Sequence, residues 1–161
     1  MKYPSIIAAA ALQLAAPAAA SFYIYIGNDI RIGMENRFWF SRGRPSCDAI
    51  VLPNSSYPLV KSISGAAQGV ACEGHLCESR WTCEGTNCHQ TDPQDIDKVE
   101  MNTSFGHYTI YKSRGWNLYD QQDSVVGKCT PTDVSGFSCV AGVPGLPVSA
   151  KSLFWCDTSV W

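Results

Sequence analysis

A histidine, a glutamate and an arginine stand at regular spacing in the second half of the chain. His107 follows Glu100 by seven residues and precedes Arg114 by seven. A histidine beside a carboxylate can transfer a proton in general acid–base catalysis, and an arginine can hold an anionic group. The three residues together therefore define one hypothesis, an extracellular hydrolase.

The position of His107 within an extended segment favours a different interpretation. Strand alternation places His107 on the side opposite Tyr108 and on the same side as Thr109 and Tyr111. A half-buried polar residue of a sheet occupies such a position. No G-x-S-x-G, H-E-x-x-H or phosphate-binding loop motif occurs in the chain. We therefore expect no catalytic site, and we keep hydrolysis as the alternative.

The cysteines carry the other chemistry that the sequence offers. Residues 72–77 and 83–88 both read C-E-G-x-x-C, and four thiolates with His75 and His89 could surround a zinc ion. Structural zinc sites prefer a two-residue gap, however, and an oxidising compartment pairs thiols. We therefore predict disulfides and no metal ion or cofactor. The eight disulfide cysteines are Cys47, Cys72, Cys77, Cys83, Cys88, Cys129, Cys139 and Cys156.

One pairing is favoured by local turn chemistry. Cys139 follows Cys129 by ten positions, and the residues between them include Pro131 and Gly136. These residue types reverse a chain readily, so we expect a bridge from Cys129 to Cys139.

An acidic cluster could provide a calcium site, because carboxylate oxygens are the ligands that calcium prefers. Its members are Asp92, Asp95, Asp97 and Glu100. The cluster lacks the EF-hand spacing, so we expect it to form a solvated turn.

The compartment follows from the first twenty residues. Lys2 supplies a positive start, Ile6–Ala16 an apolar stretch, and small alanines precede Ser21. This pattern predicts a signal peptide over residues 1–20 with cleavage before Ser21. Residues 21–161 then form a single cysteine-rich domain, secreted to the extracellular space.

Charge and sequons describe the surface of that domain. The formal net charge of the chain is −2, and loss of Lys2 makes it one unit more negative, so nucleic acid is not expected as the main partner. No apolar run of about 20 residues follows the signal, so we expect no membrane span. Asn54 and Asn102 begin N-x-S/T sequons and are candidate glycosylation sites.

The elements that must position these residues read as short strands. We expect strands over residues 21–26, 37–40, 99–102, 105–112, 116–119, 124–129, 137–140 and 152–156, because each is rich in aromatic or β-branched residues and is bounded by turn residues. Gly27–Asp29 reads as a turn that ends the first strand. Residues 48–52 are a short strand or a single helical turn, and residues 62–71 a weak strand or loop. The segment 72–97 is expected to be the least regular.

No sustained helical periodicity accompanies these strands outside the signal. The fold class is therefore all-β: a disulfide-stapled antiparallel β-sandwich or small barrel. Alternation also puts Trp39 on the opposite face from Phe38 and Phe40. If Trp39 and Trp116 are exposed, they could stack on sugars, which gives a third hypothesis, a carbohydrate- or cell-wall-binding module.

The overall organisation resembles a known group of proteins. The signal, the eight cysteines, the aromatic first strand, the segments 106–111 and 125–129 and the closing residues 154–157 are similar to those of small secreted cysteine-rich proteins of filamentous fungi. Some members act as effectors or toxins on a host or a competing microbe. The resemblance carries no functional residue over. Small secreted fungal ribonucleases use a His, a Glu and an Arg on adjacent strands, which is the model for the hydrolase alternative.

These observations favour a secreted, non-enzymatic binding protein of effector, toxin or defence type. Its partner is expected to be an extracellular protein or a glycan, and the protein itself a monomer. A ribonuclease-like hydrolase using His107, Glu100 and Arg114 and a carbohydrate-binding module using Trp39 and Trp116 are the alternatives.

Overall fold

The computed structural model describes residues 20–29, 35–50, 55–63, 67–74, 77, 93–132, 136–141 and 146–160. Its strands are β1 (Ala20–Asp29), β2 (Glu35–Ser41), β3 (Ser56–Val60), β4 (Gly69–Gly74), β5 (Ile96–Thr103), β6 (Gly106–Tyr111), β7 (Asn117–Tyr119), β8 (Val125–Pro131), β9 (Phe137–Ala141) and β10 (Leu146–Thr158). The helical elements are α1 (Cys47–Ile50) and two 3₁₀ turns, η2 (Pro93–Asp95) and η3 (Lys112–Arg114). Most of the predicted signal peptide, His75, His89, Asp92 and Asn54 lie outside the described residues.

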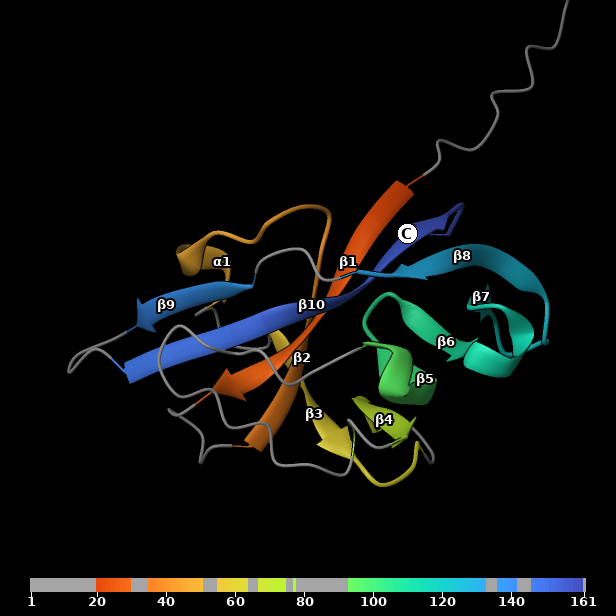
Figure 1. The fold of residues 1–161 in the computed structure, drawn as a ribbon, viewed down its shortest axis with the longest axis horizontal. Coiled ribbons are helices and arrows are strands. Elements are labelled where there is room, and N and C mark those ends of the chain that lie inside the picture. Colours follow the sequence, from red (N-terminus) through yellow and green to blue (C-terminus); the bar gives the residue numbers. More distant parts are fainter. Residues whose placement is uncertain are drawn as a thin grey trace, which may run out of the picture.

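The described strands close into a β-barrel of nine strands (Figure 1). Neighbours follow the chain from β1 to β8, then β10 pairs with β8 and with β1, which closes the ring. All these pairings are antiparallel except β3–β4, which is parallel. Of the two predicted architectures the barrel is therefore confirmed and the sandwich is not. No helix in the described part of the chain is long and apolar enough to span a membrane.

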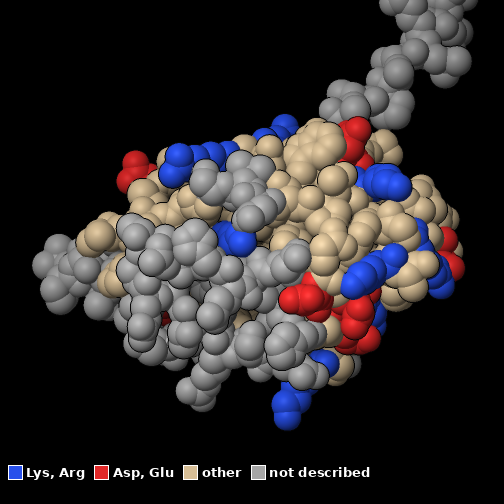
Figure 2. All heavy atoms as spheres, in the orientation of Figure 1, with Lys and Arg blue, Asp and Glu red and all other residues tan. Residues whose placement is uncertain are grey.

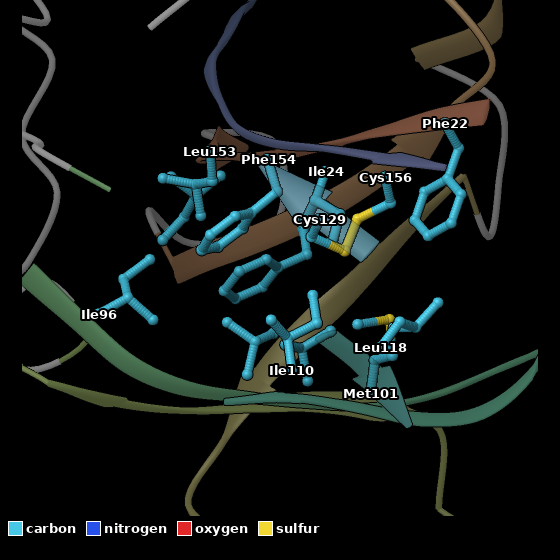
Figure 3. Close-up of a cluster of buried hydrophobic side chains, with 14 of the residues drawn as sticks. Phe22, Ile24, Ile96, Met101, Ile110, Leu118, Cys129, Leu153, Phe154 and Cys156 are labelled. Carbon is cyan, nitrogen blue, oxygen red and sulfur yellow. A yellow bond between two sulfur atoms is a disulfide. The ribbon is translucent and has the colours of Figure 1, made fainter. Parts of the chain in front are cut away.

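The main hydrophobic core fills the inside of the barrel (Figure 3). Alternate residues of β1, namely Phe22, Ile24 and Ile26, point inward and are fully buried. Met101 and Ile110 reach the same core from β5 and β6. Burying each such side chain stabilises the fold by about 1.5–3 kcal/mol, so this core supplies most of the favourable free energy.

A second, smaller apolar cluster lies on the outer side of β1, β2 and β10. Tyr25 and Trp39 point away from the barrel interior, and Ile50 of α1 and Phe137 of β9 cover them. The Trp39 side chain is only 2% exposed and its ring meets that of Phe137 edge to face at 5.9 Å. The expectation that Trp39 is an exposed sugar-stacking residue is therefore wrong, because α1 and β9 form a second layer over it.

A β-bulge allows β10 to contribute buried side chains to both hydrophobic clusters. Ile24 pairs with Phe154 and Tyr25 with Ser152, so Leu153 is the extra residue on β10. Extra residues of this kind change which face the following side chains occupy. Before the bulge, Val148 and other side chains of β10 pack in the outer cluster, and after it Phe154 packs in the barrel core.

Three disulfides join described cysteines, and they correct one prediction. The bridges are Cys47–Cys139, Cys72–Cys77 and Cys129–Cys156; Cys83 and Cys88 lie outside the described residues. The expected Cys129–Cys139 bridge is wrong. Cys129 and Cys156 face each other directly on β8 and β10, with 4.0 Å between their Cα atoms. Strands β8 and β9 pair with different halves of β10, which separates Cys139 from Cys129.

The strand predictions succeed best in the second half of the chain. The expected meander appears as β5 to β8, paired antiparallel in chain order. The turn expected at Gly27–Asp29 is wrong, because β1 continues through it. Gly27 is needed for close approach, since a Cβ there would lie 1.9 Å from the carbonyl oxygen of Ser149. Residues 47–50 take the helical alternative, and β3, which contains Pro58, was not expected.

Candidate functional site

The outer side of β5, β6 and β7 gathers the polar residues that the sequence singled out. Glu100 lies opposite Thr109 and Asn102 opposite His107, so all four side chains share the outward face of the β5–β6 pair. Thr109 in turn lies opposite Tyr119 of β7. We name this surface the outer polar face. It comprises Lys98, Glu100, Asn102, His107, Thr109, Tyr111 and Tyr119, with Arg114, Gln121 and Asp123 from the connecting segments.

His107 and Glu100 are in direct contact, as their spacing in a hairpin requires. The Nε2 atom of His107 lies 3.0 Å from Oε1 of Glu100, and both side chains are about one-fifth exposed, at 23% and 22%. Gln121 places its Nε2 atom 3.1 Å from Nδ1 of His107. The Nε2 atom of His107 therefore faces the Glu100 carboxylate, and its Nδ1 atom faces the Gln121 amide. Both ring nitrogens are therefore engaged within the protein.

Lys98 extends these contacts to the neighbouring strand. Its Nζ atom lies 3.1 Å from Oε2 of Glu100 and 3.1 Å from Oε1 of Glu73 on β4. Burial lowers the pKa of Lys98, but hydrogen bonds to Glu73 and Glu100 and their charges outweigh it, so the pKa stands above the ordinary value. Lys98 therefore remains charged, and its contacts hold the Glu100 side chain in position beside His107.

Arg114 belongs to a separate group on the same side of the barrel. Its guanidinium carbon lies 4.7 Å from the ring centre of Tyr111 and 4.9 Å from that of Tyr119. Its Nη1 atom donates to Oδ1 of Asp123 at 2.6 Å. The hydrogen bond and charge of Asp123 raise the pKa of Arg114 above its ordinary value. The predicted trio is thus only partly assembled, since Arg114 pairs with Asp123 and His107 pairs with Glu100.

Unusual backbone conformations hold this second group in place. Among described residues other than glycine, Trp116 (φ 65°) and Asp123 (φ 58°) have positive φ. This left-handed conformation costs of order 1 kcal/mol for such residues and persists only where the surroundings enforce it. The Trp116 ring packs on Phe154 of the core at 5.1 Å, and its backbone bonds to Tyr111 and Cys129. Trp116 is therefore a partly buried anchor of the core, and its role in sugar stacking stays a prediction.

The turn between β7 and β8 supplies a partner to each group. Oδ1 of Asp120 accepts hydrogen bonds from the backbone N–H groups of Gln122 and Ser124, both at 2.9 Å. This fixes the turn that presents Gln121 to His107 and Asp123 to Arg114. The outer polar face is consequently one constructed surface, on which basic and acidic side chains lie next to one another. Figure 2 shows such neighbouring charges on the right of the molecule, where Figure 1 places β5 to β8.

The remaining predicted sites fare differently. The disulfide Cys72–Cys77 removes two of the four thiolates that a zinc site would need. Asp95 in η2 and Asp97 are exposed, but Asp97 and Glu100 lie on strand β5, so the solvated turn expected for this acidic cluster is wrong for those two residues. In the part of the chain that the structure describes, no three His, Cys, Asp or Glu side chains are grouped to hold a metal ion. Asn102 donates from Nδ2 to the carbonyl oxygen of Ala67 at 3.0 Å, and its glycosylation stays a prediction.

Three comparisons with known proteins return nothing that bears on this face. No family model matches the chain, no curated protein matches it, and no solved structure matches its fold. The function has to be argued from the residues themselves.

Several residues of the face were not anticipated from the sequence. Sequence patterns did not predict a role in this face for Tyr119, Gln121, Asp123 or Lys98. Strand alternation did predict that Tyr111 lies on the same side as His107. One signal could have found the lysine, because Lys98 and Glu100 are two apart on a strand and so share a face. The partners from the β7–β8 turn had no such signal, since their contacts depend on the fold of the turn.

Proposed function

We propose that this chain is a secreted, non-enzymatic binding protein of effector or defence type, and that the outer polar face is its binding surface. The observation that carries the proposal is the positive φ of Trp116 and Asp123: Trp116 lies two residues after Arg114, and Asp123 is its partner in the exposed ion pair. Backbone strain of this kind gathers at functional positions, because elsewhere it brings only a cost in stability. Arg and Tyr are also the residue types that contribute most to binding interfaces.

Secretion is part of the proposal. The predicted signal peptide and the three disulfides among described residues support an extracellular location. A bridged barrel also resists proteolysis, because it unfolds rarely.

The contacts of His107 support binding over catalysis. A general base needs a free lone pair that faces the substrate. Both ring nitrogens of His107 already have partners inside the protein, Gln121 at Nδ1 and Glu100 at Nε2. The residue is therefore arranged as a fixed polar element of the surface.

A ribonuclease-like hydrolase is the second candidate, because His107 and Glu100 do meet at 3.0 Å on an accessible face. The test is to incubate the purified protein with RNA and with a panel of polysaccharides, following both binding and cleavage. We expect binding without turnover. RNA cleavage by the wild type that disappears in folded His107→Ala protein would replace the binding proposal with the hydrolase.

A further inference from the structure

The Arg114 group has the chemistry of an anion-recognition point. The Arg114 side chain is 44% exposed and that of its partner Asp123 is 67% exposed. Stacking on aromatic rings uses the flat side of a guanidinium and leaves its N–H edge for hydrogen bonds. Five N–H donors are present on an arginine, and one Nη1 donor goes to Asp123. Donors in excess of the internal partners are thus held at the surface by Tyr111 and Tyr119.

Asp123 indicates which anion this point accepts. Its carboxylate oxygen sits 2.6 Å from Nη1 of Arg114, so it already occupies the place of a bound carboxylate. Solvent screens an exposed ion pair such as this one, so an external carboxylate can displace Asp123 at little cost. The Asp123 carboxylate therefore occupies the position of the ligand carboxylate and competes with the ligand for Arg114.

The surroundings of Arg114 favour a sugar over a polypeptide as the carrier of that carboxylate. The centre of a protein–protein interface is apolar and depleted in charged groups. The outward positions of β5 and β6 are instead occupied by groups that form hydrogen bonds, among them Thr109, His107 and Glu100. Among described residues the exposed aliphatic side chain next to this face is Val125, opposite Tyr119 at its edge. A polar surface with tyrosines suits the hydroxyl groups and ring faces of an oligosaccharide.

We propose that the outer polar face binds a carboxylate-bearing oligosaccharide, one built from uronic acid units. Arg114 takes the sugar carboxylate in place of Asp123, Tyr111 and Tyr119 support the guanidinium, and Glu100 and Thr109 meet neighbouring hydroxyl groups. This inference rests on the proposed binding function and names its ligand.

The test is calorimetric titration of the full mature protein with oligogalacturonate, with a chelator present so that calcium bridging cannot contribute. A neutral galactan oligosaccharide of the same length and polyglutamate are titrated in parallel. We expect binding of the uronate that weakens as salt rises and that exceeds binding of both comparison ligands.

Two variants assign the binding to Arg114. Arg114→Lys keeps the charge but loses the planar fork and the stacking, so affinity should fall at least tenfold. Asp123→Asn removes the competing charge, and asparagine tolerates positive φ, so affinity should rise about two- to fivefold. Lys61→Gln, an exposed lysine on another part of the barrel, is the matched charge control and should leave affinity unchanged.

The outcomes separate this inference from the proposed function. Equal binding of the neutral oligosaccharide, or binding unaffected by Arg114→Lys, overturns the carboxylate inference and leaves a glycan-binding protein. Preference for polyglutamate overturns it in favour of an acidic polypeptide partner. Failure to bind any of the three overturns it as well, while the proposed function is judged by the separate RNA-cleavage assay.

Discussion

His107 is the residue on which the two candidate functions, binding and hydrolysis, differ. Sequence spacing alone placed it within reach of Glu100, because residues 100 and 107 lie near the turn of one hairpin. The position of Arg114 could not be foreseen in the same way. It depends on the η3 turn and on the left-handed backbone conformations of Trp116 and Asp123, which a strand pattern does not predict.

Replacement of His107 separates the two functions. His107→Ala should lower the free energy of unfolding by about 1 kcal/mol, since a partly buried sheet residue loses two hydrogen bonds. Ligand binding through Arg114 should survive. A general acid or base would instead leave a 10²- to 10⁴-fold loss of turnover on removal. Denaturant unfolding, performed alongside the activity assays, shows that the variant is folded.

Tyr25 gives the fold a dependence on alkaline pH. Burial raises the pKa of its phenol above the ordinary 10.0, Tyr23 adds to the effect, and Arg44 opposes it. A raised pKa in the folded state means that the stabilisation is complete below pH 10.0 and is lost as pH rises through the folded-state pKa. Unfolding measured from pH 8 to pH 11 should show a smaller alkaline loss of stability in Tyr25→Phe than in the wild type. Equal losses in the two proteins would assign the alkaline limb to other groups.

At the scale of elements, alternation and turn chemistry predicted local pairing but not its limits. The β5–β8 meander followed from polar turns between aromatic and β-branched runs. Strand β1 extends beyond its predicted end at residue 26. The sequence does not distinguish a glycine that permits close strand approach, such as Gly27, from a glycine in a turn. Strand β3 was missed because Pro58 demotes a strand in any local reading.

Gly27 tests the close approach of β1 and β10. Gly27→Ala should lower the free energy of unfolding by about 1–3 kcal/mol, because its Cβ would meet the backbone of Ser149 and Ala150. Gly43→Ala is the control, since nothing lies within 4 Å of a Cβ there, and it should change stability by less than about 0.5 kcal/mol. Similar effects at the two sites would contradict the tight strand contact.

At the scale of the whole molecule, composition predicted an all-β, disulfide-bridged domain, and the structure has that character. It could not predict which cysteines meet. Cys47 and Cys139 are 92 residues apart, and they approach only because α1 and β9 cover the same outer cluster. Disulfides between cysteines so far apart in the sequence depend on the completed barrel, so the local sequence does not predict them.

The disulfides should differ in their contribution to stability. In the chain-entropy model, closing a loop of 92 residues stabilises the fold by about 4.5 kcal/mol and a loop of five by about 2 kcal/mol. Joint replacement of Cys47 and Cys139 by alanine should therefore cost more than joint replacement of Cys72 and Cys77. Denaturant unfolding of the two double variants measures the difference, and the reverse order would show that the cap formed by α1 and β9 adds little constraint.

The closure of the barrel by β1 and β10 sets the order in which the chain can mature. Residues 20–29 have no complete partner until residues 148–158 are available. Under the secretion proposed above, a chain that enters the compartment amino end first carries β1, with its inward-facing Phe22, Ile24 and Ile26, unpaired along one edge through nearly all of its translocation. Cys47 likewise waits for Cys139. Such non-local closure makes folding slow and leaves the nascent chain open to chaperones and to wrong thiol pairing until its last strand arrives.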